Sequence, residues 1–197
     1  MWTTRRRLIA GTAATLLLLG GGVATAAQLM PGGGTAARPT AGMGMGSAMH
    51  GMAGSADAMF AVQMAVHHES AVQMAQLAEE RAQRPEVREL ARDIERTQTA
   101  EITQLRAAAT RQGADPDGPA GGMGSGTGSE TDLAEVPDDQ FDRAFLEAMI
   151  PHHQMGVHMA QMVQQAGSDQ EIGAMAAEMV RVQTAEISLM QGWLNQQ

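Results

Sequence analysis

Two stretches of the chain place a pair of adjacent histidines among methionines, in segments whose composition favours helix. They read FAVQMAVHHESAVQMAQL over residues 60–77 and FLEAMIPHHQMGVHMAQM over residues 145–162. Eight residues recur at an offset of 85 positions, which indicates an internal repeat. Methionine thioethers are soft ligands that favour Cu(I), and imidazole suits Cu(II) as well. The repeated pattern therefore predicts copper chemistry.

Both copies place these donors on one face of a helix. At about 100° per residue, the donors of each copy fall within an arc of about 120°. They are Met64, His67, His68 and Met74 in the first copy, and Met149, His152, His153 and Met159 in the second. A methionine at helical spacing is usually core packing, and a lone buried histidine usually finds a hydrogen-bond partner. Because the histidine pair occurs twice at equivalent positions, packing explains the methionines but not the histidines.

Two further groups carry the same donor types. Met155, His158 and Met162 lie one helical turn apart on a neighbouring face, in the second copy alone. A Gly-rich segment before the first copy contains Met43, Met45, Met49, His50 and Met52. Two interpretations of that segment remain open: it is either a flexible tether or a mobile site for a soft metal.

The helices that follow the two copies carry polar side chains on their apolar faces. These residues are Gln98 and Glu101 after the first copy, and Gln183 and Glu186 after the second. A buried carboxylate is costly unless it is paired or bound to metal. We therefore expect Glu101 and Glu186 to accept hydrogen bonds from the histidine pairs or to ligate the metal directly. A structural His–Glu hydrogen bond that only orders the bundle is the alternative.

Apolar periodicity and capping residues predict four helices. Their ranges are 57–83 with Asp57 as N-cap, about 85–111 ending before Gly113, about 137–166 ending at Gly167, and 169 to about 195 with a capping box of Ser168 and Glu171. Short links make two antiparallel hairpins, 57–112 and 131–197, joined by a Gly-rich linker at 113–130. Two such hairpins most simply pack as an all-α four-helix bundle. Pro151 in the third helix either shapes the second site through a kink or is a harmless irregularity.

The residues before the bundle divide into two segments. Residues 1–26 join the basic run Arg5–Arg7 to a short apolar stretch and an A-x-A motif at residues 24–26, which predicts an export signal. The adjacent arginines also fit the twin-arginine route, and an uncleaved membrane anchor is the alternative. Residues 27–56 form the Gly- and Met-rich tether. We expect the working domain to lie outside the cytoplasm.

Composition excludes several classes of protein. The absence of cysteine excludes disulfides, thiolate zinc sites and iron–sulfur clusters. The net charge of −9 argues against general binding of nucleic acid, which needs a basic surface. Carboxylate di-iron bundles use Glu-x-x-His, and none of the six histidines has a glutamate three residues before it. Non-haem iron oxidase chemistry is therefore not expected.

One motif resembles a known family. The run DRAFLEAMIPHHQMGVHMA at residues 142–160, followed by QTAEISLM at 183–190 and by Trp193-Leu194, is similar to the CopM-like exported proteins, long catalogued as a domain of unknown function. The resemblance covers about residues 57–197. It implies a ferritin-like helical bundle that binds copper outside the cytoplasm and contributes to copper tolerance. The first copy departs from the motif, with Val66 in place of proline and Glu69 in place of glutamine.

These observations together predict a copper-binding protein that is secreted, periplasmic or attached to the cell envelope. We expect it to sequester or pass on Cu(I) or Cu(II) without catalysing a reaction. Its expected partners are copper ions and a protein that donates or accepts copper, with no nucleic acid, and with membrane contact only through an uncleaved N-terminal segment. Two alternatives remain: a metal-dependent ferritin-like oxidoreductase, and a helical interaction module whose Met-lined grooves accept a partner helix.

Overall fold

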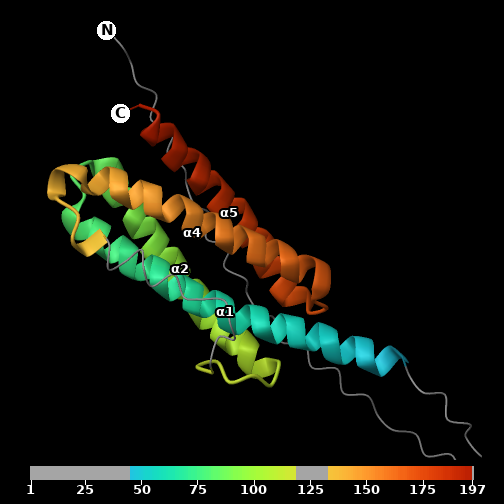
Figure 1. The fold of residues 1–197 in the computed structure, drawn as a ribbon. Helices are drawn as coiled ribbons and strands as arrows, with labels where there is room; N and C mark the ends of the chain where they lie inside the picture. Colours follow the sequence, from blue (N-terminus) through green and yellow to red (C-terminus); the bar gives the residue numbers. More distant parts are fainter. Residues whose placement is uncertain (1–44, 119–132, 197) are drawn as a thin grey trace, which may run out of the picture. The chain divides into compact units, whose positions relative to one another are not determined.

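The protein folds into a bundle of long helices. The computed structural model describes residues 45–118 and 133–196, with side chains from residue 56 onward. Within these residues the long helices are α1 (Met45–Arg81), α2 (Pro85–Arg111), α4 (Asp138–Ala166) and α5 (Gln170–Leu194) (Figure 1). No strand occurs in this part of the chain. The all-α prediction is confirmed.

Local signals explain most of the helix ends. Pro85 opens α2, where its fixed φ suits the first turn and its missing N–H costs nothing. Gly113 follows α2 with φ 76°, a left-handed conformation that glycine adopts without strain. Gly167 is the C-cap of α4, as expected. The bounds of α2, α4 and α5 agree with the sequence prediction to within a residue or two.

Three details differ from the prediction. Helix α1 begins at Met45, so residues 45–56 are helical where a flexible tether was expected. Asp57 is therefore not an N-cap; it is buried inside α1, and its carboxylate accepts hydrogen bonds from the backbone N–H groups of Ser168 and Asp169. The N-cap of α5 is Asp169 rather than Ser168, because Asp169 accepts from the second and third N–H groups of the helix. Short-range capping signals could not reveal a partner that lies more than a hundred residues away.

The helices pack as two hairpins that meet along α1 and α4. α1 contacts α2, α4 contacts α5, and α1 contacts α4. α1 and α4 run antiparallel, since Arg81 bonds to Asp138 at one end and Asp57 bonds to Ser168 at the other. This order is that of a four-helix bundle built from a repeated hairpin. Among the described residues, no helix has the length and apolar character needed to cross a membrane.

The apolar core is divided into two clusters. One contains Phe141, Phe145 and Leu90, and the other contains Phe60, Leu105 and Ile172. The buried polar side chains of the bundle interior belong to neither cluster. Besides Asp57 and Ser70, they are His68, His152, His153, Gln98 and Gln183. The repeated polar residues therefore interrupt the hydrophobic core instead of lying at its surface.

Candidate metal centre

Four imidazoles form a row across the interface of α1 and α4. The rings of His67 and His152 are stacked, with centroids 3.8 Å apart and planes tilted by 34°. His68 lies 6.2 Å from His67, and His153 lies 6.3 Å from His152. The nearly equal spacings on the two sides show that the repeat in sequence is a repeat in space. The stacked pair joins the two copies at the centre of the bundle.

A glutamate closes each end of the row. His68 Nε2 donates to Glu101 Oε2 at 2.7 Å, and His153 Nε2 donates to Glu186 Oε2 at 2.8 Å. Each bond joins the histidine helix to its hairpin partner, as the sequence predicted. Since a carboxylate can only accept, Nε2 carries a proton in both rings, and the Nδ1 atoms point away from the carboxylates.

The Nδ1 atoms of the row have no hydrogen-bond partner in the described part of the chain. This holds for all four histidines, and for Nε2 of His152 as well. His67 Nε2 donates to the carbonyl oxygen of His152 at 3.1 Å, which leaves its Nδ1 as the bare nitrogen. Unpaired buried polar atoms are costly, so several in one layer call for an explanation. Lone pairs on neutral imidazole are the atoms that bind transition metals.

The environment keeps the central imidazoles neutral. Burial, reinforced by the neighbouring His68, lowers the pKa of His67 from 6.5 to about 3. Burial, reinforced by the adjacent His67, lowers the pKa of His152 to about 2. Both rings are therefore uncharged at neutral pH, which is the form required of a metal ligand.

The predicted methionines flank the imidazole row on both sides. Met64 and Met159 lie in one apolar cluster, and Met74 and Met149 lie in the other. All four are buried. The antiparallel packing of α1 and α4 thus places the methionine before one histidine pair in the same cluster as the methionine after the other pair. Sequence spacing places these residues on one face but does not show which of them meet.

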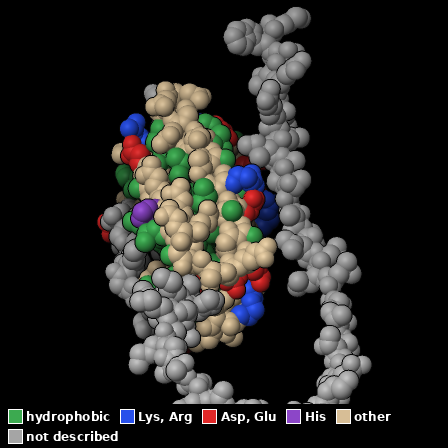
Figure 2. Space-filling view, turned by 90° about the vertical axis from the view of Figure 1, so that its right-hand side faces the viewer, with side chains coloured by type: hydrophobic (Ala, Val, Ile, Leu, Met, Phe, Trp, Pro, Cys, Tyr) green, Lys and Arg blue, Asp and Glu red, His purple; other side chains and the backbone are tan. Residues whose placement is uncertain are grey.

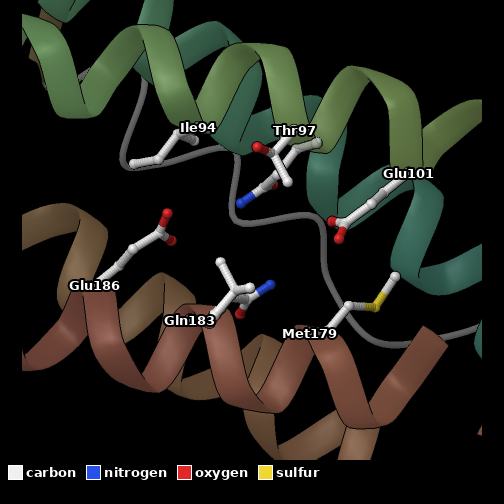
Figure 3. A pocket seen from close by; sticks show the side chains of 8 residues that line it. Ile94, Thr97, Glu101, Met179, Gln183 and Glu186 are labelled. Atoms are coloured by element: carbon white, nitrogen blue, oxygen red, sulfur yellow. The ribbon is translucent and has the colours of Figure 1, made fainter. Parts of the chain in front are cut away.

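Helices α2 and α5 enclose a small pocket beside the row. Its lining repeats at the 85-residue offset: Ile94, Thr97, Gln98 and Glu101 come from α2, and Met179, Val182, Gln183 and Glu186 come from α5. The Glu101 and Glu186 side chains extend into the space between the helices from opposite ends, with Gln183 between them (Figure 3). The volume of about 10 Å³ is near the minimum that holds one water molecule.

The described residues contain no group of three or more histidine, aspartate or glutamate side chains placed to hold a metal ion. The imidazole row is extended, and its glutamates are already bonded to histidine. Further donors near this layer are the thioethers of the buried methionines, whose side chains are flexible.

The remaining predicted donors lie elsewhere. His158, Met155 and Met162 are exposed on α4 and are not part of the buried imidazole row. In the N-terminal group, Met45, Met49, His50 and Met52 fall in the first turns of α1 with side chains outside the described residues, and Met43 lies outside them altogether. The proposed export signal and the alternative membrane anchor at residues 1–26 are also outside the described part.

Gly156 is a residue of the centre that the sequence reasoning missed. A Cβ atom at this position would lie 2.5 Å from Gln183 Oε1 and 3.1 Å from His67 Cε1. Glycine thus lets α4 approach both the polar layer of α5 and the imidazole of α1. The repeat itself could have revealed this residue, because the equivalent position in the first copy is Ala71, so that both copies have a small side chain there.

The fold and this layer define a class: a four-helix bundle with histidines and methionines across its centre. Residues 57–194 match the family described as a domain of unknown function, DUF305. The chain belongs to the DUF305 family, as its motif suggested.

Solved structures of relatives agree with this assignment. CopM in its Cu(II)-bound form is 32% identical with a TM-score of 0.63, over 71% of this chain and 96% of CopM. The Cu(I)-bound form of CopM gives a TM-score of 0.61 at 32% identity, with the same coverage. A DUF305 protein of Streptomyces coelicolor, described as secreted, is 30% identical with a TM-score of 0.66, over 73% of this chain and 94% of that one. No match was found among curated proteins.

Proposed function

We propose that this protein binds copper outside the cytoplasm through methionine and histidine side chains, and that it sequesters or passes on the metal and so contributes to copper tolerance. The observation that carries the proposal is the layer of buried Nδ1 atoms without hydrogen-bond partners. The thioethers of Met64 and Met159 lie on one side of that layer, and those of Met74 and Met149 lie on the other.

The donor chemistry favours copper over harder metals. Imidazole nitrogen and thioether sulfur are the ligands that suit Cu(I), whereas Mg²⁺, Ca²⁺ and Mn²⁺ prefer oxygen. The carboxylates of Glu101 and Glu186 bond to the opposite nitrogens of the rings. In that position they orient His68 and His153, as outer-shell carboxylates do in metal sites. The copper-bound forms of CopM support the same metal.

The location outside the cytoplasm rests on two supports. One is the predicted export signal at residues 1–26, and the other is the description of the Streptomyces coelicolor relative as a secreted protein. Whether the protein needs a partner besides copper ions depends on its function. A protein that only stores copper needs no partner, and a protein that passes copper on needs an acceptor.

The test is anaerobic competition for Cu(I) between the full-length protein and a coloured chelator. We compare the wild type with the double variant His67→Gln/His152→Gln, which removes the two stacked imidazoles but keeps polar side chains of similar reach. The exposed Gln154→Ala variant is the control. Copper should bind to the wild type and the control. At a hundredfold excess over Kd it should stabilise their folded state by about 2.7 kcal/mol and so raise their melting temperature. Both effects should be lost or strongly reduced in the double variant.

Three results would count against the proposal. Absence of copper binding in the wild type would leave a structural bundle or an interaction module. Equal binding in the double variant would place the site away from the imidazole row. Turnover of oxygen or peroxide that depends on the bound metal would favour the oxidoreductase.

A further inference from the structure

The large hydrophobic side chains that are most exposed in the described part of the chain are all methionines. They are Met59 with 54% of its surface exposed, and Met155 and Met162 with 48% each. An isolated exposed hydrophobic residue is common and needs no explanation. Two exposed methionines on one helix, with a histidine between them, do need an explanation.

Met155, His158 and Met162 occupy one stripe of α4. Their spacing of three and four residues places successive side chains one turn apart on the same face. His158 is exposed and makes no hydrogen bond or ion pair in the described part of the chain. Figure 2 shows hydrophobic side chains exposed among polar ones over one face of the bundle. The stripe thus presents two thioethers and an imidazole to solvent.

The duplicated core does not require these residues. The equivalent positions in the first copy are Ser70, Gln73 and Leu77, which include no histidine and no methionine. The stripe is therefore a property of the second copy alone, unlike the imidazole row, which both copies share. Packing gives no reason for it either, because all three side chains are exposed.

The stripe is also continuous with the buried centre. Starting from His152 in the row, Met155 is three residues along α4, Met159 is four further, and Met162 is three further. Each step is about one helical turn. The buried imidazole of His152 is thus one turn from the exposed thioether of Met155, and the buried thioether of Met159 lies between the two exposed methionines. Flexible methionine side chains can move between neighbouring positions of this kind.

We infer that Met155, His158 and Met162 form a second copper site, exposed to solvent, through which Cu(I) enters and leaves the buried centre. Transfer between the two sites is ligand exchange: a bond to one thioether or imidazole forms as another breaks, and the oxidation state of the metal does not change. The role as an entry point rests on the proposed function of the buried centre. The exposed site itself rests only on its own donors.

The experiment compares the full-length protein with the triple variant Met155→Leu/His158→Gln/Met162→Leu. Leucine and glutamine keep the size and exposure of the side chains but remove the sulfur and imidazole donors. Met59→Leu is the matched control, since it removes an exposed methionine that has no histidine on its stripe. Cu(I) is offered anaerobically from a chromophoric chelator, and both the number of bound equivalents and the rate of uptake are measured.

The exposed site should bind one Cu(I) that exchanges rapidly with the chelator. The triple variant should lose this rapidly exchanging equivalent and should fill the buried centre more slowly, while Met59→Leu should behave as wild type. The variant His67→Gln/His152→Gln separates the two proposals. If it keeps the rapidly exchanging equivalent that the triple variant loses, the exposed site exists independently of the buried one. Unchanged equivalents in the triple variant would overturn the site. An equal loss of bound copper in Met59→Leu would show a general effect of exposed thioethers and would also overturn the site. An unchanged rate of copper uptake in the triple variant would overturn the entry role.

Discussion

Acid should destabilise the metal-free protein through His67 and His152. Their folded-state pKa values of about 3 and about 2 lie far below 6.5. Above pH 6.5 both rings are neutral in the folded and unfolded states, so their titration contributes nothing to stability. Below pH 6.5 the unfolded chain binds protons that the folded chain does not, and the free energy of unfolding falls. The loss continues until the pH reaches the folded-state values.

The magnitude follows from the size of the shifts. Each histidine contributes a loss of about 1.4 kcal/mol for every pH unit below 6.5, or about 2 kcal/mol by pH 5. The two together give about 4 kcal/mol between pH 7 and pH 5, a large part of the 5–15 kcal/mol by which proteins are typically stable. Copper bound to these rings should oppose the loss, because a ligand of the folded state stabilises it.

Urea unfolding followed by circular dichroism measures this effect. The metal-free wild type and the His67→Gln/His152→Gln variant are unfolded at pH 7 and at pH 5, and the two losses of free energy are compared. Other titrating groups contribute to both proteins, so their effect cancels in the difference. We expect the wild type to lose about 4 kcal/mol more than the variant. A difference below about 1 kcal/mol would refute the reasoning, since it would mean that the buried rings protonate without penalty.

Two further predictions concern packing in the same layer. Met149→Leu should cost less than about 1.5 kcal/mol of stability but lower Cu(I) affinity, whereas Met149→Ala should cost about 2–5 kcal/mol of stability. Urea unfolding measures the stability, and chelator competition measures the affinity. Unchanged Cu(I) affinity in the leucine variant would remove Met149 from the ligand set. Gly156→Ala should fail to gain the roughly 1 kcal/mol that alanine normally adds to a helix, because its Cβ meets Gln183 and His67. Gly173→Ala, with nothing within 4 Å of its Cβ, is the control and should gain; thermal melts giving equal gains would show that the layer yields to the new methyl group.

Sequence reasoning succeeded where the signal was local or repeated. The ends of α2, α4 and α5 follow from Pro85, Gly113 and Gly167, because backbone conformation and capping depend on neighbours in the chain. The pairing of His68 with Glu101 followed from helical periodicity within one hairpin, where a short turn leaves few arrangements. Capping was also the source of the errors, since Asp57 and Ser168 have suitable side chains but are used differently.

The sequence by itself determined the all-α fold, the duplicated hairpin and the faces on which His67, His152 and their neighbours lie. These follow from the period of the helix and from the 85-residue repeat. Only the tertiary structure decided that His67 stacks on His152, that Met64 and Met159 belong to one apolar cluster, and that Met155 is left exposed. The physical reason is that periodicity assigns a residue to a side of its own helix. Which residue faces it from another helix depends on how two surfaces pack, and that is a property of the whole bundle.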